Sequence, residues 1–173
     1  SKESTPFHFW SVPTREYPQA GVITALYKDD DGHIVSGVEG EGVFKITSEG
    51  NITDHLFSGK TVSSIYKDYS GNLWFGGYYS GLYMQDAKGN VRFMLPEIKL
   101  KDIKKITGDD KGNLYLSLFG SGFIRYHLPT QTVTEYQSSS GGLRNNWIYT
   151  LLLDSRERLW IGHCNGVDYF DPV

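Results

Sequence analysis

The sequence lacks most of the features that mark membrane proteins, disulfide-rich proteins and nucleic-acid-binding proteins. It has a single cysteine, Cys164, so no disulfide can form within the chain. No apolar run approaches the ~18 residues that a membrane span needs. We therefore predict no membrane span in this chain. Residues 1–5 are polar, so we also predict no signal peptide. The formal net charge is −3, and no basic stripe is present, so we expect no nucleic-acid partner. The densest basic stretch, at residues 99–105, is interpreted as a solvated strand edge and loop.

Catalytic and metal-binding motifs are also missing. No two of the five histidines have the spacing of a metal site, and no Gly-x-Ser-x-Gly elbow occurs. The adjacent His163 and Cys164 point in opposite directions if they lie on a strand, which disfavours joint catalysis. Residues 29–32 (DDDG) lack the alternate ligands and the closing Glu of a calcium loop, and are interpreted as a solvated hairpin tip. We therefore predict no catalytic residues, no metal and no cofactor.

The sequence does contain many aromatic residues, 20 glycines and an internal repeat. An Asp-x-x-Gly-type turn between two apolar runs recurs with its aspartate at positions 29, 68, 109 and 154, so successive copies are 39, 41 and 45 residues apart. A glycine follows in each copy, at 42, 81, 122 and 166. The apolar residues alternate or cluster over five or six positions, which is strand spacing and not helix spacing. A period near 40 with four short strands per copy is typical of β-propeller blades.

Each copy is expected to form a four-stranded blade. The Asp side chain accepts backbone N–H groups in the first hairpin turn, and Gly supplies the positive φ. Because Glu157 replaces that glycine in the fourth copy, we predict a different turn there. Large aromatic residues after the repeat's Leu fill the wedge between blades; Val35 holds this place in the first copy, so packing there is expected to be thinner. The aromatic residues at this place are Trp74, Tyr115 and Trp160.

The predicted fold class is therefore all-β, a propeller of about four four-stranded blades. The expected repeats cover residues 22–57, 62–94, 103–137 and 147–171 of a single domain spanning 1–173, with 7–12 as an extra outer strand. That strand completes the last blade or pairs with another chain. Three arrangements stay open: a closed four-blade ring, an open piece of a larger propeller, and a ring shared between chains.

These residues carry a family resemblance. Residues 68–76 (DYSGNLWFG) with 81–83 (GLY), and 154–162 (DSRERLWIG) with 166–169 (GVDY), resemble the two-component regulator propeller repeat. Residues 142–148 (GLRNNWI) resemble the element that precedes an inner strand in that family. The resemblance covers residues 20–171, and the first and third copies diverge more.

The resemblance implies a non-catalytic sensor module in the periplasmic, extracytoplasmic region of a hybrid two-component histidine kinase. It also implies recognition of carbohydrate, with an oligosaccharide as the ligand. Any kinase activity would lie outside this chain. The alternatives are a structural module for protein interaction or dimerisation, self-associating through open blade edges, and a propeller lyase or hydrolase.

A ligand is expected on the face formed by the loops between second and third strands and by the connections between blades. Aromatic rings there can stack on sugars, while amides and an Arg bind hydroxyl groups. The alternative is a structural role, in which the Trp packs between blades and the two Asn residues form turns. The candidate ligand-binding residues are Tyr78, Tyr79, Phe119, Arg144, Asn145, Asn146, Trp147 and His163.

Overall fold

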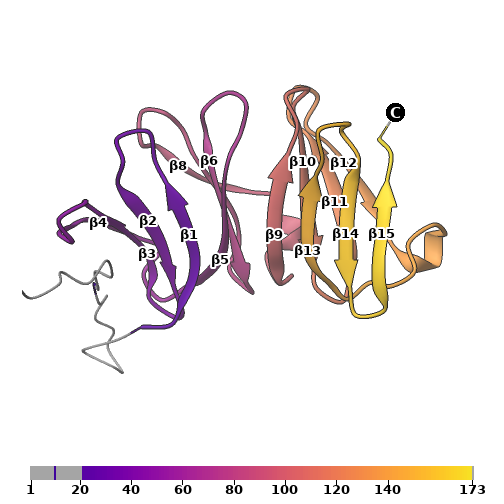
Figure 1. Ribbon diagram of the computed structural model, residues 1–173, viewed down its shortest axis with the longest axis horizontal. Coiled ribbons are helices and arrows are strands. Elements are labelled where there is room, and N and C mark those ends of the chain that lie inside the picture. Colours follow the sequence, from indigo (N-terminus) through magenta and orange to yellow (C-terminus); the bar gives the residue numbers. More distant parts are fainter. Residues whose placement is uncertain (1–9, 11–20, 173) are drawn as a thin grey trace, which may run out of the picture.

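The computed structural model describes residue 10 and residues 21–172. These residues form fifteen strands and two short 3-10 turns (Figure 1). The strands of the first two blades are β1 (Ile23–Lys28), β2 (Ile34–Val38), β3 (Gly42–Ile46), β4 (Ile52–Leu56), β5 (Thr61–Lys67), β6 (Leu73–Tyr78), β7 (Gly81–Gln85) and β8 (Val91–Met94). The others are β9 (Ile103–Gly108), β10 (Asn113–Leu118), β11 (Gly122–His127), β12 (Thr132–Tyr136), β13 (Ile148–Leu153), β14 (Leu159–His163) and β15 (Gly166–Phe170), with the 3-10 turns at Pro96–Ile98 and Ser138–Ser140.

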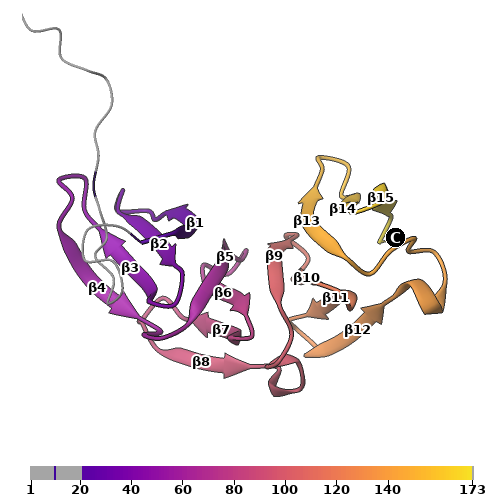
Figure 2. The same ribbon diagram turned by 90° about the horizontal axis from the view of Figure 1, so that it is seen from below.

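The strands form four antiparallel sheets in chain order, β1–β4, β5–β8, β9–β12 and β13–β15, which we call the first to fourth blades. Figure 2 shows the blades side by side in an open arc. The strands β1, β5, β9 and β13 line its inner side, and β4, β8 and β12 run along its outer rim. The predicted all-β propeller architecture is confirmed.

The first hairpin turn of each blade is built around the repeated aspartate. In the second blade, Asp68 Oδ1 accepts the backbone N–H groups of Ser70 and Asn72, both at 2.9 Å. Gly71 follows with φ +87°, in the left-handed region that glycine occupies without a steric penalty. This pattern explains why an aspartate and a glycine recur at a fixed spacing.

The predicted departure from this turn in the fourth blade is wrong. Glu157 adopts φ +62° and keeps the same turn, with its N–H donating to the Asp154 carbonyl at 2.9 Å. Asp154 Oδ1 still accepts the N–H groups of Arg156 and Arg158. The side-chain bonds to the aspartate hold a non-glycine residue in a conformation that costs about 1–2 kcal/mol.

The core lies between blades. Trp74 and Leu82 of the second blade pack against Ile106, Leu114 and Ile124 of the third. A second cluster joins the third and fourth blades through Tyr115 and Phe123 on one side and Ile148, Leu151 and Ile161 on the other. The second and third blades therefore each have one face that packs on the preceding blade and one that packs on the following blade.

Hydroxyl groups on the innermost strands add polar links between neighbouring blades. Thr24 Oγ1 donates to the Val62 carbonyl at 2.5 Å, and Ser63 Oγ donates to the Ile103 carbonyl at 2.6 Å. Ser64 Oγ also accepts the Ile106 N–H at 2.9 Å. These bonds fix the innermost strands of successive blades against one another where side chains are too small to pack.

The two ends of the arc expose the faces that are buried elsewhere. Ile23 and Leu26 of β1 are 45% and 70% exposed, whereas the corresponding Ile103 and Ile106 of β9 are 0% and 1% exposed. Val167 of β15 is likewise exposed where its counterparts in other blades are buried. Within the described residues, the first blade therefore lacks a preceding neighbour and the fourth lacks a following one.

The predicted outer strand at residues 7–12 lies outside the described residues, apart from Trp10. The Trp10 ring lies against Gly50 in the turn between β3 and β4, so this residue contacts the first blade. The fourth blade has three strands in the part of the chain that the structure describes. No helix among the described residues is long and apolar enough to cross a membrane.

Candidate functional site

A row of aromatic side chains runs across the second, third and fourth blades on the edge that carries the loops after β6 and β10, the lower edge in Figure 1. Tyr78 and Tyr79 meet edge to face with ring centroids 4.4 Å apart. Phe119 meets Trp147 at 4.8 Å and Tyr149 at 5.0 Å. All of these rings except Phe119 are more than half exposed.

Lys104 joins the two halves of this row. Its Nζ lies 5.9 Å from the centre of the Tyr78 ring and 5.0 Å from that of Phe119, within cation–π range. Asp102 fixes the ammonium group at 2.9 Å. We call the set Tyr78, Tyr79, Lys104, Phe119, Trp147 and Tyr149 the aromatic row.

Tyr79 has an unusual backbone. Its φ is +45°, in the left-handed region, at a loop position where the first and third blades have Gly40 and Gly120. The Ser80 hydroxyl stabilises the loop by donating to the carbonyls of Tyr78 and Thr61. A bulky residue held in this region costs about 1–3 kcal/mol. Tyr79 shares this feature with other non-glycine residues, among them Leu95 and Glu157.

Trp147 has a structural contact as well as an exposed face. Its ring lies over Gly120, about 3.5 Å from the position that a Cβ there would occupy. The backbone N–H of Trp147 donates to Asn145 Oδ1 at 2.7 Å. Trp147 therefore closes the loop after β10 and presents its other face to solvent.

The remaining predicted site residues have mainly structural contacts. Asn146 Oδ1 accepts the Ser138 N–H at 2.8 Å, so both Asn145 and Asn146 hold turns. His163 is buried, and its Nε2 lies 3.2 Å from Asp168 Oδ2 without hydrogen-bond geometry. Arg144 is exposed but pairs with the same Asp168 through Nε at 3.3 Å. The structure thus brings Tyr78, Tyr79, Phe119 and Trp147 together, and puts Arg144 and His163 around Asp168.

The sequence analysis missed two members of the row. Lys104 belongs to the stretch interpreted as solvated, yet it lies between two rings. Tyr149 corresponds to Thr24 and Ser63, whose hydroxyl groups bind the following blade. It is exposed because the described residues form no blade after the fourth. The sequence did contain a signal for Tyr149. Trp147, Ile148 and Tyr149 alternate, so the two aromatic side chains lie on the face of the strand opposite to the buried Ile148.

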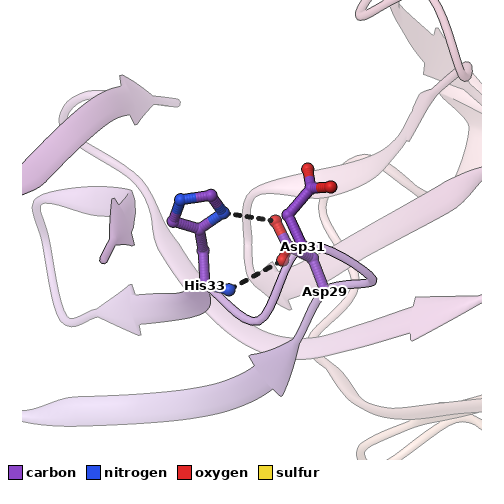
Figure 3. A group of neighbouring side chains, drawn as sticks. All are labelled: Asp29, Asp31 and His33. Carbon is purple, nitrogen blue, oxygen red and sulfur yellow. Dashed lines mark hydrogen bonds and ion pairs between the residues drawn. The ribbon is translucent and has the colours of Figure 1, made fainter. Parts of the chain in front are cut away.

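A second group of polar side chains gathers at the opposite edge, in the first hairpin turn. Figure 3 shows His33 held to Asp29, with its N–H 2.8 Å from Asp29 Oδ1 and its ring Nδ1 3.5 Å from Oδ2. Asp29, Asp31 and His33 place one possible ligand atom each within 4.8 Å of one another, an arrangement that could hold a metal ion. However, the Lys45 ammonium lies 2.7 Å from Asp29 Oδ2 and already neutralises that carboxylate.

The acids with displaced pKa values are turn residues that favour the ionised form. Burial acts to raise the pKa of Asp29, but hydrogen bonds from Lys45 and the His33 N–H outweigh it and lower that pKa. The Trp160 indole N–H lowers the pKa of Asp154, together with the N–H groups of its turn. A general acid needs the opposite shift, so these carboxylates are suited to holding turns.

The fold defines the class of protein as a β-propeller built from repeated blades. Two segments, residues 56–79 and 142–165, match the family described as two component regulator propeller. Both segments include residues on which the sequence resemblance was based. The predicted resemblance to that family is therefore confirmed.

One curated relative is a histidine kinase, named P4, from Formosa agariphila. It is 28% identical over 170 residues, covering 85% of this chain but 12% of the kinase. The chain thus spans about an eighth of the length of that relative.

Solved structures with a similar fold include sensors and enzymes. The extracellular domain of a putative hybrid two-component system from B. thetaiotaomicron superposes with a TM-score of 0.79 at 24% identity, covering 95% of this chain and 23% of that one. The extracellular domain of a putative one-component system from the same organism gives 0.71 at 22% identity, with coverages of 86% and 21%. An inactive virginiamycin B lyase from Staphylococcus aureus gives 0.67 at 18% identity, with coverages of 88% and 56%.

Proposed function

We propose that this chain is a non-catalytic part of the extracytoplasmic sensor region of a two-component signalling protein, and that its aromatic row binds carbohydrate. The observation that carries the carbohydrate proposal is the row itself, in which rings from three blades lie along one edge and all except Phe119 are more than half exposed. The sensor assignment is supported by the two family matches and by the fold shared with extracellular domains of such systems.

The chemistry of the row suits a sugar chain. Tyrosine and tryptophan rings offer flat apolar faces for the C–H side of a pyranose, and their polar atoms remain available to hydroxyl groups. Lys104 adds three N–H donors between the rings. Successive rings on neighbouring blades would contact successive sugars, so an oligosaccharide fits better than a monosaccharide.

The test is oligosaccharide binding by the Tyr78→Ala/Tyr79→Ala variant. Wild-type protein is screened by calorimetry against gluco-, xylo-, manno- and galacturono-oligosaccharides, and the best ligand is titrated into the variant. We expect at least about a 10-fold loss of affinity, because stacking of a flat group such as a nucleic-acid base on one aromatic ring is worth about 1–3 kcal/mol. Tyr69→Ala is the matched control, since Tyr69 is as exposed as these tyrosines but lies in the first hairpin turn of the second blade, at the opposite edge. Unchanged binding by the double variant contradicts the proposed site.

We propose self-association as a second function, supported by the exposed ends of the arc. The first blade presents Ile23 and Leu26, and the fourth presents Leu152, Val167 and Tyr169, all of them exposed apolar side chains. These are the two complementary halves of the interface that the blades use among themselves. A second copy of the chain can therefore stack its first blade on the fourth blade of its partner.

Light scattering over a dilution series tests this second proposal. Wild-type protein is expected to show a mass that rises with concentration, because buried apolar area favours association. Leu26→Glu is expected to give a monomer, whereas Leu100→Glu, which changes an equally exposed leucine in the connection between the second and third blades, should leave the mass unchanged. A monomeric wild type at all concentrations refutes self-association.

A further inference from the structure

A cleft of about 370 Å³ lies between the first and second blades, at the edge that carries the Asp turns. Its floor is apolar and includes Val35 and Val43 of the first blade and Phe75 of the second. Its rim is charged and includes Asp29 and Lys45. The cleft lies at the opposite edge from the aromatic row, so it is a separate candidate site.

A smaller cleft of about 290 Å³ lies at the equivalent place between the second and third blades, where Trp74 lines it. The larger cleft has no such ring in its lining, because the first blade lacks the aromatic residue that the other blades have. Trp74 Nε1 donates to Asp68 Oδ2 at 2.8 Å, and Trp160 Nε1 donates to Asp154 Oδ2 at 2.8 Å. In the third blade the hydroxyl of a tyrosine, Tyr115, lies 3.4 Å from Asp109 Oδ2. The first blade has Val35 at this position but keeps the aspartate, so an aromatic ring with an N–H or O–H group is missing beside a carboxylate.

Lys45 occupies the oxygen that the missing ring would bind. Its Nζ lies 2.7 Å from Asp29 Oδ2, the atom that corresponds to the indole acceptor in the second and fourth blades. Lys45 corresponds in the repeat to Met84, which packs against the core between the second and third blades. The lysine therefore supplies the donor that the ring provides elsewhere, but no ring fills the space over the valines.

The charge of the rim favours a cation. Five aspartates line the cleft and two lysines balance part of their charge, leaving an excess of negative charge; the charged residues are Asp29, Asp30, Asp31, Asp54, Asp86, Lys45 and Lys67. An apolar floor under an anionic rim matches a planar ring that carries a protonated amine.

We propose that this cleft binds a small aromatic amine. Its ring lies over Val35 and Val43, in the space that an indole fills in the second blade, and an N–H group donates to Asp29 Oδ2 in place of Lys45. The protonated amine interacts with the aspartates of the rim other than Asp30, which already pairs with Lys67. Burial of a ring of this size accounts for most of the affinity, and the carboxylate selects for donors and against anions.

Calorimetric titration with tryptamine tests the proposal, with indole-3-acetate as the anionic counterpart of similar shape. We expect tryptamine to bind and indole-3-acetate to bind at least about 10-fold more weakly, which corresponds to about 1.4 kcal/mol. Equal binding of the two compounds, or binding of neither, overturns the proposal.

Three variants locate the site. Val35→Trp supplies the missing ring from the chain itself and should abolish tryptamine binding while raising the melting temperature. Lys45→Met removes the competing ammonium and should bind tryptamine several-fold more tightly, whereas Asp29→Asn should bind it about 10-fold more weakly. If Val35→Trp does not fold, as judged by circular dichroism, the other two variants still decide the outcome.

Asp30→Asn is the control for general attraction to an acidic surface. Asp30 is exposed and pairs with Lys67 on the rim, so its removal changes the net charge without changing the acceptor. We expect less than a twofold effect on the affinity for tryptamine. A loss as large as that of Asp29→Asn would show nonspecific attraction and refute the proposed contact.

Discussion

The interface between the first and second blades differs sharply from the one between the second and third. Both use the same strands of the repeat and the same turn aspartate, yet one contains the small cluster Val35, Val43, Val62 and Phe75, and the other has ten buried residues around Trp74. The Trp74 ring also meets Tyr126 edge to face at 6.2 Å. Both interfaces therefore contain a buried cluster, but the one without the aromatic residue has the smaller cluster and the larger, charged cleft.

The difference also shows how a repeat can vary without losing its backbone. The aspartate accepts turn N–H groups in both blades, so the hairpin does not depend on the ring. The second oxygen changes its partners, from the Asn72 amide and the Trp74 indole to the Lys45 ammonium. The backbone role and the packing role of the same aspartate are thus separable.

The largest difference between the two interfaces is expected when the side chain at the aromatic position of the repeat is truncated. Trp74→Ala is expected to lower the free energy of unfolding by about 3–5 kcal/mol, because it leaves a large cavity and an unpaired Asp68 oxygen. Val35→Ala removes two methyl groups and should cost about 1.5 kcal/mol. Urea unfolding measures both, and equal costs would show that the two interfaces contribute alike.

The aspartates should show the next largest difference. Asp68 is nearly buried and accepts bonds from the Asn72 side chain and the Trp74 indole as well as from the turn, so Asp68→Ala is expected to cost about 2–3 kcal/mol. Asp29→Ala loses one turn N–H bond and a partly exposed ion pair, and should cost about 1 kcal/mol. Thermal unfolding of the two variants under the same buffer checks the order; a larger cost for Asp29→Ala would contradict it.

Low pH should destabilise the turns in which the aspartate binds an indole and those in which it binds a lysine. The pKa of Asp154 is lowered by the Trp160 indole, and that of Asp29 by Lys45 and His33 against the effect of burial. A carboxyl group with a lowered pKa stabilises the fold above its unfolded value, near 3.8, and this stabilisation is lost as the pH falls through the folded value. We expect the melting temperature to fall below about pH 4, and to fall less steeply in Asp154→Asn. An identical pH profile for that variant would exclude Asp154 as a source of the loss.

The smallest effect on stability should come from the residue with positive φ in the first hairpin turn. This residue is Gly71 in the second blade and Glu157 in the fourth. Gly71→Ala places a Cβ at φ +87°, where its one close neighbour is Lys67 Cε at an ordinary contact distance of 3.9 Å, so only the backbone penalty of about 1 kcal/mol is expected. Glu157→Gly relieves the same penalty and should stabilise by about 0.5 kcal/mol, since the exposed pair with Lys111 contributes little. Chemical denaturation in moderate salt measures the change in the free energy of unfolding for both variants. If both changes have the same sign, the two turns do not carry the same backbone penalty and the prediction is wrong.

The sequence was sufficient to predict the architecture because the repeat encodes each blade locally. The aspartate, the turn glycine and the apolar first strand all act within about 15 residues, and the thinner packing at Val35 followed from the missing aromatic residue. The turn at Glu157 was mispredicted because side-chain bonds to Asp154 outweigh the preference of glycine for that conformation.

The candidate site was predicted only in part, because it is assembled across blades. Tyr78, Tyr79, Phe119 and Trp147 could be found from their loop positions. The place of Lys104 between two rings depends on the distance between the second and third blades, which no local pattern encodes. Asn145 and Asn146 were weighed as ligands or turn residues, and the structure places their oxygens in turn hydrogen bonds.

The aromatic row has a mechanical consequence. Its rings are carried by three blades, and Lys104 of the third blade lies against Tyr78 of the second. Any rotation of one blade relative to the next changes the spacing of the rings, and a rigid ligand lying along them resists that rotation. A ligand bound along the row, as proposed above, would therefore stiffen the whole arc.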